Sequence, residues 1–222
     1  MSIDDSEMTG GPLEGVPTLL LNEHAQHARM GALAEFLDVP RPLEVVREGG
    51  EDDGSRAHAR GLVSWFSGDL RAAHAAFEMA VASRRSLTRG DPRLAASLNA
   101  LGATAIALHD AVRGSEHLTQ AVALRAEWLG TSAPQTAVTE SNLGVARFIL
   151  GQFDEAAELC SCASQKLIEL GGSWEMRGTH AASCAARAYD RLGRHTEARA
   201  WLAVAKRHRL DAGELASELI VN

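Results

Sequence analysis

The sequence predicts an all-α, right-handed solenoid of four stacked helical hairpins. The first observation behind this prediction is an internal repeat, in which a small residue recurs at a nearly constant interval as Gly61, Gly102, Gly144 and Ala186. A second small residue follows each of them by twelve positions (Ala73, Gly114, Ala156 and Ala198), and a bulkier one by sixteen (Phe77, Leu118, Cys160 and Leu202). Columns of small and bulky residues at one fixed period indicate helix pairs that pack closely and stack on their neighbours.

The second observation is a turn signal at the centre of the repeats. Gly68, Gly151 and Gly193 each separate two helical stretches, which predicts a tight turn between a first helix (helix A) and a second helix (helix B). The second repeat has His109 and Asp110 at this place, so we expect its turn to be the weakest. The third observation is the Gly-to-Pro spacing between repeats, as in Gly130 to Pro134, since glycine ends helices and proline begins them.

These signals divide the chain into five parts. Residues 1–16 are expected to be a disordered acidic tail, 17–48 a helical arm, and 49–54 an acidic, glycine-rich linker after which Ser55 caps the first hairpin. The array covers 55–210, with repeats at about 55–90, 91–131, 132–172 and 173–210. The last B helix is expected over 195–208, and a separate capping helix over 211–222.

Composition limits the class of protein. A chain of 222 residues with 45% hydrophobic content can bury a substantial core. No apolar run approaches the roughly 18 to 20 residues that a membrane-spanning helix needs, and the acidic N-terminus does not look like a secretory signal. We therefore expect a cytoplasmic protein without membrane insertion, in which Cys160, Cys162 and Cys184 are reduced thiols.

Charge is distributed unevenly along the chain, whose formal net charge is −7. Residues 1–56 hold 12 of the 29 acidic residues but only 4 of the 22 basic ones, so the repeats are nearly neutral. Arg187, Arg191 and Arg194 form a basic patch in the last repeat. The patch is expected to receive an acidic partner or the chain's own Glu51, Asp52 and Asp53, or else to be a solvated helix face.

The repeats resemble the tetratricopeptide repeat family over about residues 55–208. The family's pattern of a small residue in helix A, a glycine turn, an early alanine in helix B, a large apolar residue and another alanine is reproduced by Gly144, Gly151, Ala156, Cys160 and Ala163. The period of about 42 residues is longer than the usual one and is similar to the kinesin light chain type of repeat. The aromatic residue usual in helix A is present only as Tyr189.

The resemblance implies a binding module whose A helices line a concave groove that receives a peptide or protein segment. The groove residues expected in this chain are Asn99, Asn142, Trp65, Phe148, His58, His180 and Arg187. Asparagine both donates and accepts hydrogen bonds, so Asn99 and Asn142 are suited to holding a peptide backbone of any sequence. The alternatives are that the asparagines only solvate or cap their helices and that the aromatic residues pack between helices.

We expect the partner to be another protein or peptide, and we also consider self-association through the charge asymmetry. Nucleic acid is not expected, because the chain is acidic and lacks a basic footprint. His24 and His27 share a helix face, but no further ligand completes a metal site, and neither a phosphate loop nor a nucleophile elbow is present. We therefore expect no cofactor, no metal and no enzymatic activity.

The expected role is that of an adaptor, scaffold or regulatory subunit. One alternative is a sensor of a ligand or peptide that is autoinhibited by its acidic N-terminal arm. A more distant alternative is an enzyme with a site between the arm and the array.

Overall fold

The computed structural model describes residues 52–87 and 92–220, with side chains described as far as residue 207. The tail expected at 1–16, the arm at 17–48, and His24 and His27 lie outside the described residues. Within these residues the chain forms eight α-helices and one short 3₁₀-helix, and no strand. The helices are α4 (Asp53–Phe66), α5 (Leu70–Leu87), α6 (Pro92–Ala107), α7 (Ala111–Leu129), α8 (Pro134–Ile149), α9 (Phe153–Leu170), η1 (Gly172–Trp174), α10 (Glu175–Arg191) and α11 (His195–Ile220).

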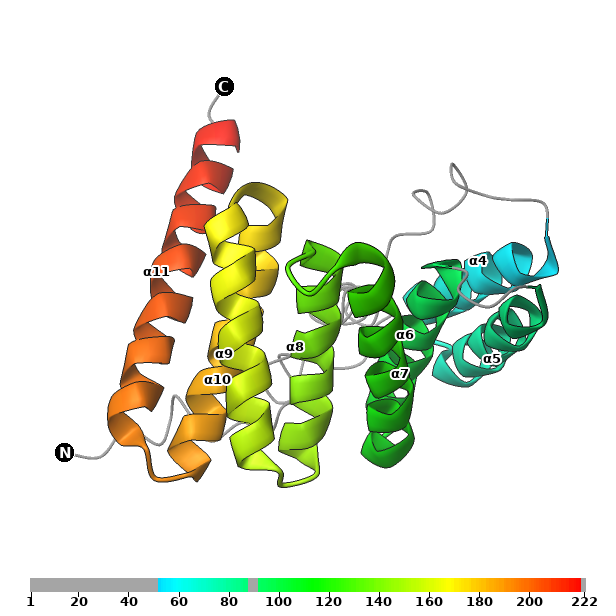
Figure 1. The fold of residues 1–222 in the computed structure, drawn as a ribbon. Coiled ribbons are helices and arrows are strands. Elements are labelled where there is room, and N and C mark those ends of the chain that lie inside the picture. The colour runs from blue at the N-terminus through cyan, green and yellow to red at the C-terminus, as the bar shows by residue number, and fades with distance from the viewer. Residues whose placement is uncertain (1–51, 88–91, 221–222) are drawn as a thin grey trace.

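Consecutive helices pack side by side, so the array is a row of four hairpins (Figure 1). Helices α4, α6, α8 and α10 are the A helices, and α5, α7, α9 and α11 are the B helices. A helices of neighbouring hairpins also contact each other, as α6 does α8 and α8 does α10. This arrangement confirms the predicted all-α solenoid. None of the helices in the described part of the chain is long and apolar enough to cross a membrane.

The recurring glycines lie where helices A and B approach most closely. A Cβ atom built on Gly61 would come within 2.5 Å of the Phe77 ring, and one built on Gly102 within 2.7 Å of Leu118. At Gly144 the nearest atom to such a Cβ is the Cys160 sulfur. Each glycine therefore makes room for the bulky residue sixteen positions later, as the repeat predicts.

All four hairpin turns close in the same way. Gly68, Gly151 and Gly193 have positive φ angles, which confirms their predicted role, and His109 takes the fourth place with φ at 65°. In each turn this residue donates its backbone N–H to a carbonyl three positions back, and the next residue donates to one five positions back. This is the Schellman closure of a helix end. His109 thus adopts a left-handed conformation that glycine adopts at little cost.

Two helix boundaries differ from the prediction. Asp52, not Ser55, is the N-cap of α4, because its Oδ1 accepts from the Ser55 backbone N–H at 2.8 Å. Ser55 lies inside the helix, so the expected cap was one turn too late. At the other end, α11 runs without a break to Ile220, and no separate helix starts at 211. The stretch contains no proline, and Gly213 costs a helix interior only about 1 kcal/mol.

Polar clamps join the first three hairpins. Arg84 on α5 donates to the Arg93 carbonyl at 2.7 Å and to Ser97 Oγ, both on α6. Arg125, at the matching position of the next repeat, does the same to the Gln135 carbonyl at 2.6 Å and to Thr139 Oγ1 on α8. The arginine column and the hydroxyl column form a second repeat that sequence reasoning missed.

The junction between the third and fourth hairpins is built differently. Ala181 stands one repeat after Thr139 and has no hydroxyl, and Leu167 stands one repeat after Arg125 and has no guanidinium. The neighbouring Lys166 pairs within its own hairpin, with Glu140 at 2.8 Å. Here Ser164 Oγ donates to the Gly178 carbonyl at 2.8 Å. Gly178 also lets α10 approach α9, since a Cβ there would come within 2.7 Å of Ile168.

Candidate functional site

Three polar residues of the predicted groove lie on the A helices of successive hairpins. His58 lies on α4, Asn99 on α6 and Asn142 on α8, and all three are buried. Asn142 Nδ2 donates to Asn99 Oδ1 at 3.0 Å, so the two predicted asparagines meet across neighbouring hairpins. The structure thus brings together the pair that sequence reasoning favoured most.

His58 belongs to a buried polar cluster with the first clamp. Its Nδ1 lies 3.1 Å from Ser97 Oγ, the same oxygen to which Arg84 donates. Burial and the nearby Arg84 charge lower the pKa of His58 to about 3. The imidazole is therefore neutral at physiological pH, and its ring centroid lies 5.3 Å from that of Phe77.

The two predicted aromatic anchors lie in hydrophobic clusters. Trp65 is fully buried with Leu62, Phe77 and Leu101. Phe148 is 7% exposed and packs with Val145 and Cys184, its ring 5.4 Å from that of Phe153. Packing between helices, the alternative role for these rings, is therefore present, and contact with a partner stays a prediction.

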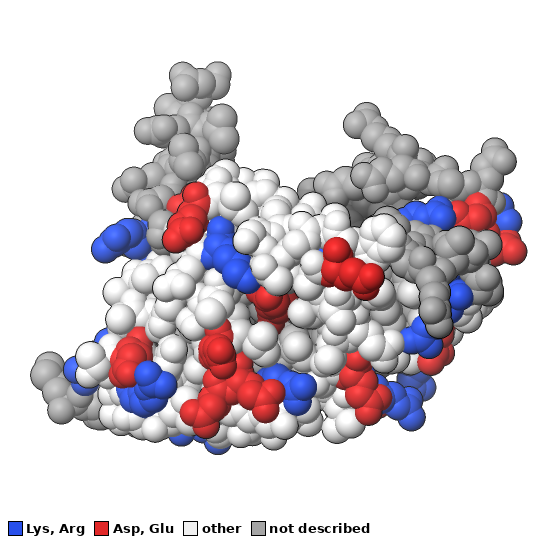
Figure 2. Space-filling model, viewed as in Figure 1, with Lys and Arg blue, Asp and Glu red and all other residues white. Residues whose placement is uncertain are grey.

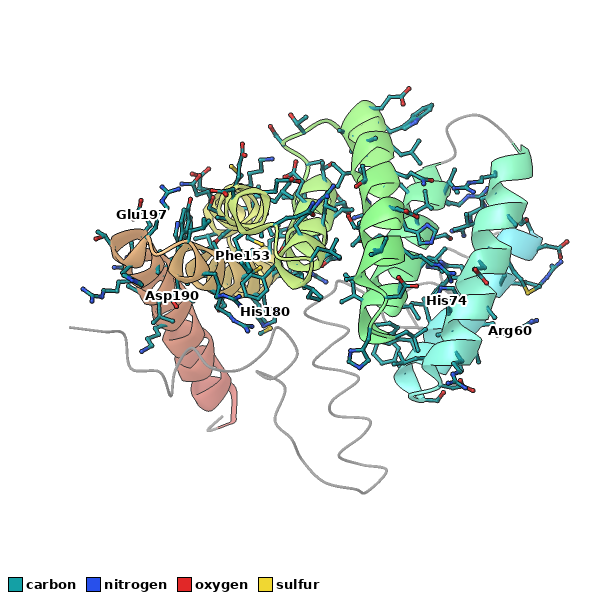
Figure 3. All side chains as sticks on the ribbon, turned by 90° about the horizontal axis from the view of Figure 1, so that it is seen from below. Arg60, His74, Phe153, His180, Asp190 and Glu197 are labelled. Carbon is teal, nitrogen blue, oxygen red and sulfur yellow. The ribbon has the colours of Figure 1, made fainter. Side chains whose placement is uncertain are left out.

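His180 and Arg187 are the more accessible members of the predicted set. Both are half-buried on α10, and His180 is labelled in Figure 3, which views the molecule from the edge that carries the hairpin turns of α8–α9 and α10–α11. The Arg187 guanidinium lies 5.1 Å from the centroid of the Phe148 ring. The predicted site is thus most open at the fourth hairpin, and its members on the first three hairpins are buried.

The predicted basic patch is held against aromatic rings. Arg191 lies 4.5 Å above Phe153, and Arg194 lies 4.6 Å above Tyr189. Arg194 also pairs with Glu197 at 2.8 Å, an interaction that raises the pKa of Arg194 and lowers that of Glu197. Both charges are therefore stabilised by each other.

The acidic residues expected to pair with this patch are engaged elsewhere. Asp52 accepts from Arg93 at 2.6 Å, and Asp53 pairs with Arg56. The Ser55 N–H and then Arg93 lower the pKa of Asp52 to about 2. Pairing of the patch with these two aspartates is therefore wrong, because they cap and anchor α4, while Glu51 lies outside the described residues.

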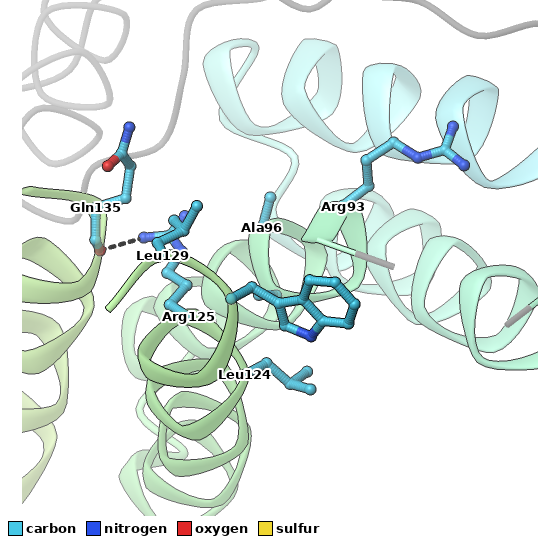
Figure 4. A pocket seen from close by; sticks show the side chains of 8 residues that line it. Arg93, Ala96, Leu124, Arg125, Leu129 and Gln135 are labelled. Atoms are coloured by element: carbon cyan, nitrogen blue, oxygen red, sulfur yellow. Dashed lines mark hydrogen bonds between the residues drawn. The ribbon is translucent and has the colours of Figure 1, made fainter. Parts of the chain in front are cut away.

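A surface pocket lies between the second and third hairpins, and none of the predicted site residues lines it. It has a volume of about 240 Å³, and its apolar wall includes Leu124, Leu129 and the half-exposed Trp128 (Figure 4). Arg125, at its side, is turned towards the Gln135 carbonyl. Sequence reasoning missed Trp128, which the repeat places in one column with Leu87 and Leu170, so an apolar residue at this position gives no signal of exposure.

Two cysteines are part of the core. Cys160 is fully buried and Cys184 is 8% exposed in the same cluster, whereas Cys162 is exposed. Burial raises the pKa of the Cys160 thiol, which favours the neutral form. In the described part of the chain, no three His, Cys, Asp or Glu side chains lie where they could hold a metal ion.

Known protein families and solved structures share this arrangement of helices. The tetratricopeptide repeat family matches residues 93–165, which are the second and third hairpins. The chain contains tetratricopeptide repeats. The first and fourth hairpins share the turns and spacing of the matched pair, so the tetratricopeptide architecture extends over all four. A comparison with curated proteins found no match.

Solved structures with the same fold include kinesin light chain repeats. The crystal structure of BtubC (BKLC) from P. vanneervenii superposes with a TM-score of 0.65 at 16% identity, covering 86% of this chain and 73% of that one. Kinesin light chain nearly identical TPR-like repeats from Podosopora anserina give a TM-score of 0.57 at 20% identity, covering 85% and 89%. A variant of the latter gives 0.59 at 20% identity, covering 86% and 90%. These neighbours agree with the long tetratricopeptide repeat type indicated by the period.

Proposed function

We propose that this protein is a non-catalytic interaction module that binds an extended segment of another protein along its A helices. The observation that carries the proposal is the meeting of Asn99 and Asn142 across hairpins two and three, at 3.0 Å. The two amides are at most 1% exposed and are bonded to each other, so they hold α6 against α8 and keep in place the A-helix surface that a partner would contact. The tetratricopeptide fold supports protein binding as the general class of function.

The proposed site extends from the asparagine pair towards the fourth hairpin. His180 and Arg187 lie on α10, the A helix that contacts α8, and both are half-buried. His58 and Trp65, which are also buried, extend the site towards the first hairpin. A partner would contact the half-buried side chains of α10, while the buried amide pair keeps α6 and α8 in place. In this proposal the protein works in the cytoplasm as an adaptor, scaffold or regulatory subunit.

Site-specific photocrosslinking tests the surface. A photoreactive phenylalanine analogue replaces His180 on α10 in the native cell, and a matched variant carries it at Met79, which is 57% exposed on the B helix α5. We expect a partner band that depends on the His180 position and is absent from the Met79 position. Crosslinking from Met79 alone would contradict binding along the A helices.

The partner so captured allows a test of the amide pair. Asn142→Ala leaves Asn99 without its amide donor and is expected to weaken binding by about tenfold, a loss of roughly 1.4 kcal/mol. Because both residues are buried, the variant is compared only after thermal unfolding shows that it is folded. His180→Ala, on the half-buried part of the same surface, gives a second measure. Unchanged affinity in both variants would refute the site.

The second candidate function is an autoinhibited sensor. The observation that favours it is the charge asymmetry of the sequence, since residues 1–56 hold 12 acidic and 4 basic residues. If this segment competes for the site, its removal raises the apparent affinity for the captured partner. Equal affinity with and without residues 1–51 would exclude the sensor and leave the simple interaction module.

A further inference from the structure

Three arginines are stacked on aromatic rings at the edge that carries the hairpin turns. Arg187 covers Phe148 at 5.1 Å, Arg191 covers Phe153 at 4.5 Å, and Arg194 covers Tyr189 at 4.6 Å. We call these six residues the turn-edge surface. Phe153 is labelled in Figure 3, which views the molecule from this edge, next to Asp190. The surface joins the end of α8, the start of α9 and the end of α10.

Stacking prepares a guanidinium for binding. A ring beneath the guanidinium fixes its plane and leaves the N–H groups at its edge directed sideways, where a carboxylate can accept two of them. A side chain already held in place loses less conformational entropy when it binds a ligand. Edge-to-face contact between Phe148 and Phe153, at 5.4 Å, joins two of the stacks into one unit.

The charges around the surface are mostly paired. Arg194 is paired with Glu197 at 2.8 Å, His195 with Asp190 at 3.0 Å, and Arg147 with Glu155 at 3.3 Å. Arg191 differs, because it is exposed and makes no ion pair with any residue in the described part of the chain. It is therefore the guanidinium from which a carboxylate would displace no acidic partner among the residues that the structure describes.

The neighbouring acids decide between two kinds of anionic partner. Acidic and basic side chains alternate along the lower edge of the molecule in Figure 2, which is the edge of these turns in Figure 1. A nucleic acid carries a continuous row of phosphates, which such a mixed edge repels at every acid. A peptide carries its carboxylates on rotatable side chains, so it can place some of them beside the arginines and turn the others away from the acids.

We propose that the turn-edge surface binds an acidic segment of the partner protein, with Arg191 on Phe153 as the central contact. This inference rests on the proposed function, because it names the chemistry of the segment that leaves the A-helix site at the fourth hairpin. Binding at this surface requires a planar cation stacked on a ring, whereas general attraction between opposite charges requires only the positive charge. Lysine at the same position keeps the charge but not the planar, two-donor geometry.

The test measures binding of a fluorescein-labelled oligoglutamate peptide to the full chain by fluorescence anisotropy at low salt. Arg191→Glu is expected to weaken binding by about tenfold, and Arg191→Lys by about threefold. The control is Arg60→Glu, which changes an exposed arginine on α4 in the first hairpin and should alter affinity by less than about twofold. Phe153→Leu, which removes the ring and keeps an apolar side chain, should match Arg191→Lys.

Four results would overturn the inference. They are absence of oligoglutamate binding, equal losses in Arg191→Glu and Arg60→Glu, tighter binding of a single-stranded oligonucleotide through the same arginines, and a concentration-dependent dimer that Arg191→Glu abolishes. The last result would assign the surface to a second copy of the chain. Asn142→Ala should leave oligoglutamate binding unchanged, because the peptide does not contact Asn99 or Asn142. The turn-edge surface can therefore fail this test while the A-helix site passes its own, and the reverse also holds.

Discussion

Three glycines in the middle of A helices decide how closely the two helices of a hairpin approach. Gly61, Gly102 and Gly144 each face a bulky residue of helix B across a gap too small for a Cβ atom. These helix B residues differ greatly in size, from Phe77 to Cys160, yet the number of residues between successive repeats hardly changes. Every repeat therefore keeps a small residue on helix A, whereas the residue of helix B that faces it varies in size.

At the residue scale, His58 gives a pH-dependent stability. Its pKa of about 3 in the folded protein lies below the ordinary value of 6.5, so between these values the unfolded state binds more protons. Stability therefore falls as pH is lowered through the unfolded pKa. Between pH 7.5 and 5.5 this loss amounts to about 1.4 kcal/mol from His58 alone.

Urea unfolding at the two pH values measures this contribution. His58→Phe keeps a ring against Phe77 and removes the titrating group, so its loss of stability on acidification should be smaller than that of the wild type by about 1.4 kcal/mol. Equal losses in wild type and His58→Phe would show that His58 is not held neutral by the fold.

At the element scale, the turn of the second hairpin carries backbone strain that the other three turns avoid. His109 has φ at 65° where Gly68, Gly151 and Gly193 stand in the other hairpins. A left-handed conformation costs a residue with a Cβ roughly 1 to 2 kcal/mol more than glycine. The following Asp110 compensates in part, since its side chain accepts from the Arg113 N–H at 3.1 Å and caps α7.

The backbone strain at His109 is tested by measuring the free energy of unfolding of two turn variants. His109→Gly is expected to raise the free energy of unfolding by about 0.5 to 1 kcal/mol, because relief of strain exceeds the added entropy of the unfolded chain. Gly151→Ala is the reverse change and should lower it by about 1 kcal/mol. An added Cβ at Gly151 meets nothing within 4 Å, so the loss reports backbone conformation alone. Destabilisation by His109→Gly would contradict the account.

Helix positions were predictable because most helix ends are marked by residues next to them in the sequence, such as glycine and proline. Glycine turns and the Gly-to-Pro spacing place most of the boundaries within a few residues, and the turn at His109, which has no glycine, is placed by the repeat period. The errors arose where two signals compete locally, as at Asp52 and Ser55, where either side chain can cap a helix. The break predicted before residue 211 failed because a capping-box sequence can also lie inside a continuing helix.

The candidate site was less predictable than the fold, for a physical reason. Periodicity shows which helix a residue is on but not how far a neighbouring hairpin covers it, so Asn99 and Asn142 were placed on the right helices without their mutual contact. The stacked arginines could not be found either, because the central stack joins residues on different elements, Arg191 of α10 and Phe153 of α9. The basic patch was recognisable as a charge pattern, and its rings were not.

At the scale of the whole molecule, the array is joined by two kinds of junction. Arg84 and Arg125 clamp the first three hairpins through a carbonyl and a hydroxyl of the next A helix. The last junction lacks this hydroxyl, because Ala181 replaces it, and depends instead on close packing at Gly178. Stability in such arrays is the sum of hairpin and junction terms, so each junction can be measured separately.

A double-mutant cycle measures the clamp. Arg125→Met and Thr139→Val each remove one partner, and we expect a coupling free energy of about 0.5 to 1.5 kcal/mol between them in urea unfolding. The control cycle combines Arg125→Met with Thr179→Val on α10, whose hydroxyl donates to the Glu175 carbonyl and not to Arg125, and should give coupling close to zero. Equal coupling in the two cycles would show that the repeated arginine is not what joins the hairpins.

The Cys160 sulfur, seated against Gly144, provides the molecule with an internal reporter of its own opening. An alkylating reagent reaches this buried thiol only when helices α8 and α9 separate, whereas Cys162, two positions along the same helix, is open to the reagent at all times. The ratio of the two labelling rates therefore gives the fraction of time that the third hairpin spends apart, without any engineered probe. Ligand that tightens this hairpin would slow the labelling of one cysteine and leave the other unchanged.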